Sequence, residues 1–229
     1  MVGIIGAMSV EVENILLEMQ QTGEEAVSGI TYYTGKIGGR DCVVAKCGVG
    51  KVAAAVCAQT MILRYNPQLL INVGVAGGIG EGIHIGDIVV SSGLVQHDID
   101  TSALGDPKGL ISGLNLVTIP ADENLVRLVA QTAVTVYGSG IHVGIIATGD
   151  QFISDADMLA RLARDFSAAA CEMEGGSIAQ VCYMNQVGFV VIRAISDNAN
   201  EDASVDFTTF EAESAHKTAE LIAQVVPVL

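Results

Sequence analysis

Apolar residues in this chain fall into short runs that alternate with longer segments of helical spacing. The short runs are bounded by glycine or polar residues, as in buried strands. The predicted strands are Val2–Gly6, Tyr32–Gly35, Cys42–Ala45, Leu69–Val73, Ile85–Val90, His142–Ala147 and Val187–Ile195, and a further strand end is expected at Glu172–Glu174. The predicted helices run from Val10 to about Gln20 with Ser9 as N-cap, from the glycines at 48–50 to about Tyr65, and over Ala121–Tyr137, Ala156–Phe166, Gly176–Asn185 and Phe210–Val225.

Strands and helices alternate through the whole chain, which predicts an α/β fold with helices on both faces of the sheet. The 229 residues are 50% hydrophobic, enough for one sizeable core. We find no repeat, linker or low-complexity segment, so a single domain over residues 1–229 is expected. The polar, glycine-rich segment from Gln96 to Asn115 is the one long predicted loop.

The charge and the cysteines narrow the class of protein. The formal net charge is -15, from 26 acidic and 11 basic residues, and no basic cluster is present. Nucleic-acid binding is therefore not expected. No apolar run approaches the ~20 residues of a membrane helix, and the first apolar stretch predicts a strand, not a signal peptide. Five scattered cysteines favour reduced thiols in the cytoplasm.

Two carboxylates, Glu172 and Glu174, follow the small apolar run Ala168–Ala170 and precede a predicted helix. If the strand continued through both, the two side chains would share a face. Ligands of α/β proteins bind at such strand ends. The alternative is one solvated carboxylate and one structural ion pair.

Polar residues recur at other strand ends, namely Gly77–Gly78, Phe152–Ile153 and Asp197, so these ends are expected to meet in one cleft. Arg193 lies within an apolar strand and needs a buried partner, for which Glu172 and Glu11 are the candidates. Glu11 falls in the first turn of a helix, where a surface carboxylate would also be favourable.

Two weaker motifs leave other readings open. The segment from Gly48 to Ala53 resembles a truncated dinucleotide fingerprint, but the acidic residue about 20 positions later is absent and glycines also form plain tight turns. The segment from His97 to Asp100 could be drawn as a metal site, although it lacks a recognised ligand spacing. Neither a metal nor a cofactor is expected.

Seven segments in order resemble the bacterial 5′-methylthioadenosine/S-adenosylhomocysteine nucleosidases. They are Gly6–Met8 with Glu11, Gly48–Ala55, Gly74–Gly78, Gly86–Val90, Gly149–Ile153, Glu172–Glu174 and Arg193–Asp197. The resemblance implies a purine nucleoside phosphorylase-like fold, a single three-layer α/β domain with a twisted mixed sheet, usually dimeric. It also implies hydrolysis of the N-glycosidic bond of these two nucleosides, and of 5′-deoxyadenosine, in methionine salvage and methyl-cycle recycling.

The resemblance assigns catalytic roles to three acids. Asp197 would protonate adenine at N7, Glu174 would hold the ribose hydroxyls, and Glu11 would activate the water with support from Arg193 and Glu172. These roles suit a reaction that needs a neutral leaving base and a stabilised sugar cation. The other implied substrate-binding residues are Met8, Gly77, Phe152, Ile153, Met173, Ser196 and Phe207.

Two departures from the family concern substrate preference. Val75 replaces a serine that the family often has, and the loop from Thr101 to Asp106 lacks the aromatic side chains of relatives. Three alternatives stay open: a phosphate-dependent phosphorylase, a hydrolase of another adenine nucleoside such as aminodeoxyfutalosine, and a noncatalytic nucleoside-binding module. A homodimer is expected because only 16% of residues are charged and 50% are hydrophobic.

Overall fold

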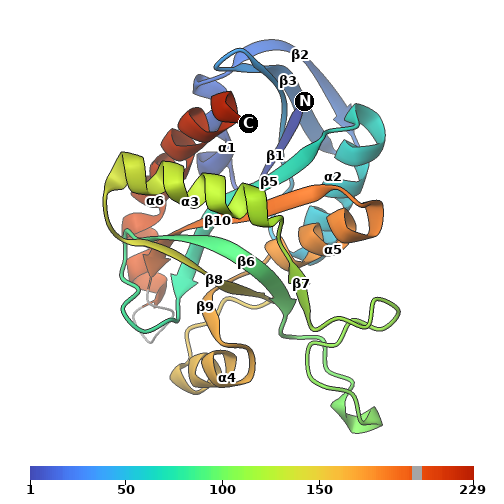
Figure 1. Ribbon diagram of the computed structural model, residues 1–229, viewed down its shortest axis with the longest axis vertical. Helices are drawn as coiled ribbons and strands as arrows, with labels where there is room; N and C mark the ends of the chain where they lie inside the picture. The colour runs from blue at the N-terminus through green and yellow to red at the C-terminus, as the bar shows by residue number, and fades with distance from the viewer. Residues whose placement is uncertain (198–202) are drawn as a thin grey trace.

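A mixed β-sheet runs through the centre of the protein, with helices on both faces (Figure 1). The computed structural model describes residues 1–197 and 203–229, and the side chains of residues 203–206 lie outside this description. The strands are β1 Val2–Gly6, β2 Gln20–Val27, β3 Ile30–Ile37, β4 Arg40–Lys46, β5 Leu69–Gly78, β6 Ile88–Gln96, β7 Thr118–Pro120, β8 Ile141–Thr148, β9 Ala168–Glu172 and β10 Gly188–Asp197. The helices are α1 Ser9–Leu17, α2 Lys51–Tyr65, α3 Glu123–Tyr137, α4 Ala156–Phe166, α5 Gly175–Asn185 and α6 Ala203–Val225, with short 3-10 turns at Ser102–Leu104 and Val226–Val228.

Five of the strands pair in a closed ring. β10 pairs with β5 on one side and β6 on the other, and the path continues through β8 and β9 back to β5. Strands β1, β4, β3 and β2 extend the sheet outward from β5. Closure brings Asp197 of β10 and Cys171 of β9 into register with the same residue, Gly77 of β5. The predicted strand ends therefore do lie side by side.

Two apolar layers separate the sheet from its helices, so the predicted three-layer α/β fold is confirmed. Helices α2 and α5 pack on one face, and α1, α3 and α6 pack on the other (Figure 1). Both faces of the sheet are apolar because successive side chains of a buried strand point to opposite faces. In β5, Leu70 belongs to the first apolar layer and the next residue, Ile71, belongs to the second. Full burial of each such side chain stabilises the fold by roughly 1.5–3 kcal/mol.

The first helix and the strand after it differ from the prediction. Helix α1 ends at Leu17 instead of Gln20, because Gln20 already begins β2. The sequence did not predict β2, which lies at the edge of the sheet and is mostly exposed and polar; among the described strands it pairs with β3 alone. Ser9 does not cap the helix. Its hydroxyl accepts a hydrogen bond from Lys46 Nζ at 3.0 Å.

Strands β5 and β6 also differ from the strands predicted from the sequence. β5 is longer than predicted, and β6 begins and ends later in the chain. The segment after Val73 continues β5 up to Gly78, because β10 pairs with it as far as Gly77 and β9 pairs with Gly77 and Gly78. β6 begins at Ile88 and continues through the polar Ser91, whose buried hydroxyl accepts a hydrogen bond from Val191 N at 2.9 Å. Tertiary pairing thus satisfies positions that look like turns in the sequence.

Candidate active site

A cavity opens where the ends of β5, β9 and β10 meet the N-termini of α1 and α2. It is lined by Ala7, Met8, Glu11, Val49, Val75, Ala76, Gly77, Phe152, Cys171, Glu172, Met173, Glu174, Ser196, Asp197 and Phe207. An adjoining hollow shares several of these residues and adds Gln151 and Ile153. Of the twelve residues predicted from the sequence, only Arg193 lines neither space. It lies behind the acidic residues, almost wholly buried.

Glu11 is held by three backbone amides. Its Oε2 accepts hydrogen bonds from Ala7 N at 2.7 Å and Met8 N at 2.9 Å, and its Oε1 accepts one from Val75 N at 3.2 Å. Burial raises the pKa of Glu11, opposed by the charge of Arg193 and by these amides. Glu11 is thus a buried, oriented carboxylate and not the exposed helix-start residue that remained possible from the sequence.

Glycine at position 74 makes room for Glu11. A Cβ atom there would stand 2.6 Å from Glu11 Oε1 and 3.0 Å from Arg193 Nη1. Such approaches are far inside ordinary contact distance, so any side chain would displace the acid or the guanidinium. The glycine-rich end of β5 therefore serves close approach, as its composition suggested.

Glu172 forms the structural ion pair of this site. Its carboxylate is bonded by Arg193 Nη2 and Thr148 Oγ1, and its Oε2 also accepts hydrogen bonds from Glu174 N at 3.1 Å and Gly175 N at 2.7 Å. Arg193 Nη2 also donates to Asn72 Oδ1 at 2.6 Å. Of the two partners open to Arg193, the direct pair is formed with Glu172.

Glu174 does not share a strand face with Glu172. Strand β9 ends at Glu172, and Glu174 takes the N-cap position of α5 with φ −130° and ψ −43°. Its Oε1 accepts a hydrogen bond from Gly50 N at 2.8 Å, and its Oε2 lies 3.9 Å from Arg193 Nη2. Burial, reinforced by the charge of Glu172 and opposed by Arg193, raises the pKa of Glu174 to about 7.

The glycine-rich motif at residues 48–53 therefore serves the site without a dinucleotide. Gly50 has φ 97°, a conformation that favours glycine, and in it the peptide N–H points at Glu174. The amide that resembled a phosphate-binding donor is already bound by a carboxylate of the same chain. The sequence did not predict that the Gly50 amide donates to Glu174. The glycines at 48 and 50 were the feature of the sequence that could have indicated it.

Asp197 ends β10 inside the cavity. It is buried, lies opposite Gly77 in the β5–β10 pairing, and its Oδ2 accepts a hydrogen bond from Ser196 Oγ at 3.0 Å. The next residue in the sequence, Asn198, lies outside the described residues. Asp197 is thus fixed at the point where β5, β9 and β10 converge.

Phe152 and Phe207 form an aromatic wall at the mouth of the cavity. Their ring centroids are 5.7 Å apart and the planes meet at 84°, an edge-to-face contact. Phe152 is half exposed, with 49% of its surface accessible. Both rings line the cavity, and Phe152 has accessible surface left for contact with a planar ligand. Cys171, Val49 and Ala7 also line the cavity; Val49 and Ala7 lie in segments that resemble the nucleosidases, but none of the three was predicted as a site residue.

Positive charge is missing from the surface of this cavity: none of the described lining residues is lysine, arginine or histidine. Among residues 1–197 and 203–229, no group of three His, Cys, Asp or Glu side chains is placed to hold a metal ion. In the possible metal motif, Asp98 pairs with Lys51 at 2.6 Å and Asp100 accepts a hydrogen bond from Ser102 N. Over the same part of the chain, no helix is long and apolar enough to cross a membrane.

The fold and site place the chain in one class of proteins. Residues 1–227 match the family model described as the phosphorylase superfamily. A 5′-methylthioadenosine/S-adenosylhomocysteine nucleosidase of Shewanella sediminis is 41% identical over 223 residues, 96% of each chain. The chain belongs to this nucleosidase family, so the family and the enzyme class predicted from the sequence are confirmed.

Solved structures agree with this family membership. The nucleosidase of Neisseria meningitidis, in complex with methylthio-immucillin-A, has a TM-score of 0.96 and 33% identity, covering 100% of this chain and 99% of the other. The futalosine hydrolase of Helicobacter pylori has a TM-score of 0.94 and 34% identity, covering 100% of this chain and 97% of the other.

Proposed function

We propose that this protein hydrolyses the N-glycosidic bond of 5′-methylthioadenosine and S-adenosylhomocysteine, releasing adenine and the 5-substituted ribose. The observation that supports it best is one cavity with three buried carboxyl groups, those of Glu11, Glu174 and Asp197, beside an aromatic wall. The named relatives act on, or bind analogues of, such nucleosides.

Asp197 is proposed as the general acid. Adenine leaves as a neutral molecule only if a proton reaches its N7, and a carboxyl group within a buried strand end can deliver one. Phe152 would stack on the purine, and Ile153, in the adjoining hollow, would hold its edge through the backbone. Gly77 lets the base approach β5, and Ser196 orients Asp197.

Glu174 and Glu11 act on the sugar and the water. Glu174, as a carboxylate, would accept hydrogen bonds from the ribose hydroxyls and stabilise the developing sugar cation. Glu11, raised in pKa by burial, would be a stronger base toward the attacking water. The buried pair of Arg193 and Glu172 lies next to Glu174 and Glu11 and would hold them in position. Met8, Met173 and Phe207 would pack against the ribose and its 5′ group.

Water, and not phosphate, is the proposed nucleophile. A phosphorylase needs cations beside the ribose, but the described cavity lining contains none. Asn72 stands in the strand before the glycines, and its Nδ2 donates to Ile5 O at 2.9 Å while its Oδ1 is bound by Arg193. The nearest guanidinium is thus occupied by Glu172 and Asn72 and is not free for a dianion.

A second candidate substrate is a futalosine-type nucleoside, because the Helicobacter pylori futalosine hydrolase has the same fold at similar identity. Such a nucleoside shares the glycosidic bond and differs in its 5′ group. It would therefore use the same three acids, and only the pocket around Phe207 and the loop after Gln96 would discriminate.

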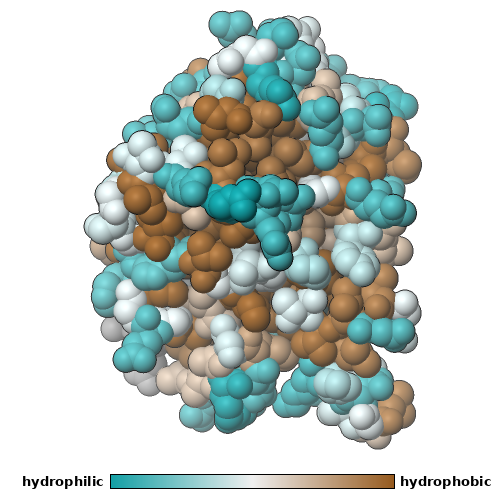
Figure 2. Space-filling model, viewed as in Figure 1, coloured by the Kyte–Doolittle hydropathy of each residue, from teal (hydrophilic) through white to brown (hydrophobic). Residues whose placement is uncertain are grey.

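A homodimer is part of the proposal. Helix α2 exposes Val52, Val56 and Leu63 at helical spacing, with 76%, 40% and 73% of their surfaces accessible. Helix α5, joined to α2 by paired Gln59 and Asn185 side chains, continues this apolar face. Figure 2 shows apolar surface gathering on the right-hand side, where Figure 1 has α2 and α5.

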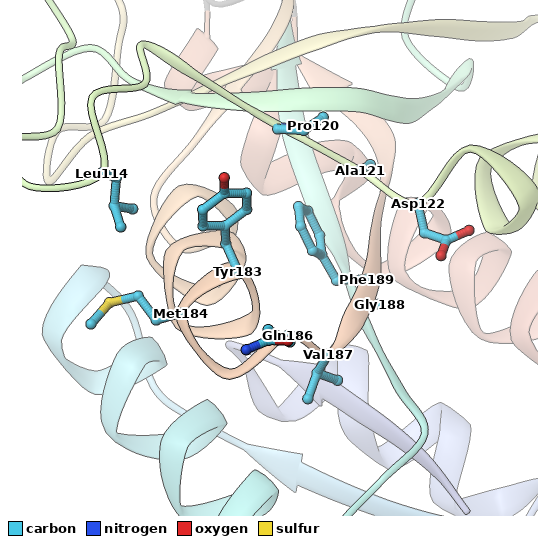
Figure 3. Close-up of a pocket in the computed structure, with 10 residues that line it drawn as sticks. All are labelled: Leu114, Pro120, Ala121, Asp122, Tyr183, Met184, Gln186, Val187, Gly188 and Phe189. Carbon is cyan, nitrogen blue, oxygen red and sulfur yellow. The ribbon is translucent and has the colours of Figure 1, made fainter.

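The face continues into a groove at the end of α5. Tyr183 and Met184 project from α5, and Leu114, Pro120 and Phe189 complete the walls (Figure 3). Neighbouring exposed apolar side chains of this kind are typical of a protein interface. Leu104, with 84% of its surface accessible, is a further exposed apolar side chain, in the loop after β6.

A cytoplasmic location is also proposed. All five cysteines are free and buried. Free thiols in place of disulfides suit a reducing compartment.

The test is adenine release from a panel of 5′-substituted adenosines with and without phosphate. We expect turnover of methylthioadenosine and S-adenosylhomocysteine that is independent of phosphate and yields the free sugar. The panel includes 5′-deoxyadenosine and aminodeoxyfutalosine, and a preference for the latter would favour the second candidate. Release that requires phosphate and yields a ribose 1-phosphate would reject hydrolysis.

A further inference from the structure

The start of α2 and the loops after β6 and β8 are joined beside the cavity by a ring of hydrogen bonds through Lys51, Asp98 and Asp150. Lys51 Nζ donates to Asp98 Oδ1 at 2.6 Å, and Asp150 N donates to Asp98 Oδ2 at 3.0 Å. The Lys51 amide donates to Asp150 Oδ1 at 2.8 Å and closes the ring. We call these three residues the clamp. None of them lines the cavity.

The clamp is better protected from water than the other ion pairs of the surface. The side chains of Lys51 and Asp98 are 17% and 22% exposed, whereas those of the Lys36–Asp41 pair are 47% and 60% exposed. Burial alone would raise the pKa of Asp98, but hydrogen bonds from Lys51 and the Asp150 amide hold it below its ordinary value. The Asp98 carboxylate is therefore charged at neutral pH, and its attraction to Lys51 is screened less than in an exposed pair because both side chains are partly buried.

The clamp is one peptide away from Glu174. Gly50 directly precedes Lys51, and its N–H is the donor to Glu174 Oε1 at 2.8 Å. The backbone of Gly50, at φ 97°, packs closely against Asp150, since a Cβ on Gly50 would stand 3.1 Å from Asp150 Oδ1. Asp150 thus holds the Gly50–Lys51 peptide, directly after the peptide whose N–H orients Glu174, and Asp98 holds Asp150 and the Lys51 side chain in place.

We propose that the clamp is a positioning device for Glu174 and that it couples the loop after Asp98 to the active site. The proposal rests on the proposed function, in which Glu174 holds the ribose. If the ion pair is lost, the Gly50 amide moves away from Glu174 and the carboxylate loses its orientation. Displacement of a catalytic group by about 1 Å can cost roughly 10²-fold in rate.

The variants are Asp98→Asn and Lys51→Met, each of which removes one charge from the ring. Asp41→Asn, in the exposed pair with Lys36, is the matched control. We expect kcat/KM for methylthioadenosine to fall roughly ten- to hundredfold in both clamp variants and to stay at the parent value in the control. Lys51→Arg, which keeps the charge, should restore most of the activity.

Two readouts separate positioning from a general loss of structure. In a Glu174→Gln background the clamp variants should have little further effect, because the group they position is already changed. The acid limb of the kcat/KM profile should move to higher pH, since the Gly50 amide is one of the groups that lower the pKa of Glu174. The other charged groups around Glu174 are Glu172, Arg193 and Glu11, and the variants leave them in place.

A carbon-13 NMR titration of the Glu174 carboxyl group, with no substrate present, gives the same information independently of turnover. An inactive parent would reject the proposed function, and the titration would still test the clamp. A folded clamp variant with an unchanged Glu174 titration, or with the same loss in the Glu174→Gln background, would overturn the proposal. Failure of both variants to fold would show that the clamp is only structural and would overturn it as well.

Discussion

Asp197 is the residue on which the proposed chemistry depends most directly. Asn at this position keeps the shape and can still accept a hydrogen bond from Ser196, but it has no proton to transfer. We expect Asp197→Asn to lower kcat roughly 10²–10⁴-fold with substrate binding largely retained. Steady-state kinetics and calorimetric titration measure the two effects. Turnover within a few-fold of the parent would remove Asp197 from the mechanism.

Glu174 connects catalysis to stability through its pKa of about 7, raised from an ordinary value of 4.5. The folded state binds the Glu174 proton more tightly than the unfolded state does, so protonation of Glu174 stabilises the fold. This stabilisation is complete below pH 4.5 and is lost as pH rises through 7. Glu174→Gln stays neutral. The free energy of unfolding of the variant, relative to that of the parent, should therefore increase between pH 5 and 7 by at most about 1.4 kcal/mol per pH unit. This difference should become constant above about pH 8.

Denaturant unfolding of both proteins at several pH values measures this difference. Glu13→Gln, an exposed residue of the same helix as Glu11, is the control and should follow the parent. A constant difference between Glu174→Gln and the parent across this range would show that Glu174 titrates as an ordinary carboxyl group.

At the scale of elements, strand β5 is built to pass close to Glu11 and Arg193. In Gly74→Ala the new Cβ would meet Glu11 Oε1 at 2.6 Å, so the carboxylate must leave its three amides. We expect a fall in melting temperature and at least a tenfold loss of kcat/KM, the order of effect of a displaced catalytic group. Gly23→Ala in β2, whose Cβ would have Thr34 Oγ1 as nearest atom at 3.2 Å, should change neither.

The loop after β6 is the element that bears on substrate preference. Within the chain, Asp106 accepts a hydrogen bond from Thr101 Oγ1 at 2.8 Å, Lys108 lies 4.0 Å from Asp165, and Leu104 does not line the chain's own cavity. If a second copy supplies this loop, Leu104 forms a smaller wall than an aromatic residue. Discrimination between close analogues in such a pocket reaches only ~1–3 kcal/mol.

We therefore expect this enzyme to prefer methylthioadenosine over S-adenosylhomocysteine less than relatives with aromatic residues in this loop do, and to accept small or polar 5′ groups. The measurement is kcat/KM for these two nucleosides, 5′-deoxyadenosine and a longer alkylthioadenosine, repeated in Leu104→Phe, which should favour the apolar tails. A steep rise with apolar tail length in the parent, with poor use of S-adenosylhomocysteine, would contradict this expectation.

For the whole molecule, the exposed face of α2 and α5 predicts a two-fold dimer. Val52→Glu places a charge on this face, and burying it in an interface would cost several kcal/mol. We expect light scattering to give a dimer mass for the parent at micromolar concentration and a monomer mass for the variant. Val134→Glu on α3, 50% exposed and on the opposite side of the sheet, is the control. A monomeric parent would refute the dimer.

The hydrophobic pattern alone determined most elements and the class of fold. Helix α4 has the predicted bounds, and α2, α3 and α5 agree within a few residues, because helical spacing and cap residues are local signals. The order of the motifs also indicated which acids meet at the strand ends. The edge strand β2 was invisible, because an exposed strand with one neighbour needs no apolar alternation.

Only the tertiary structure decided how these residues work on one another. Closure of the five-stranded ring brings Asp197 and Cys171 to Gly77, Arg193 pairs with Glu172 and not Glu11, and Gly50 donates its amide to Glu174 across 124 positions of sequence. Contacts between residues far apart in the sequence do not show in the hydrophobic pattern. Each of these side chains fits its own strand or turn equally well with many different partners. The choice among those pairings is made when the sheet closes and buried charges must find partners in the space that remains.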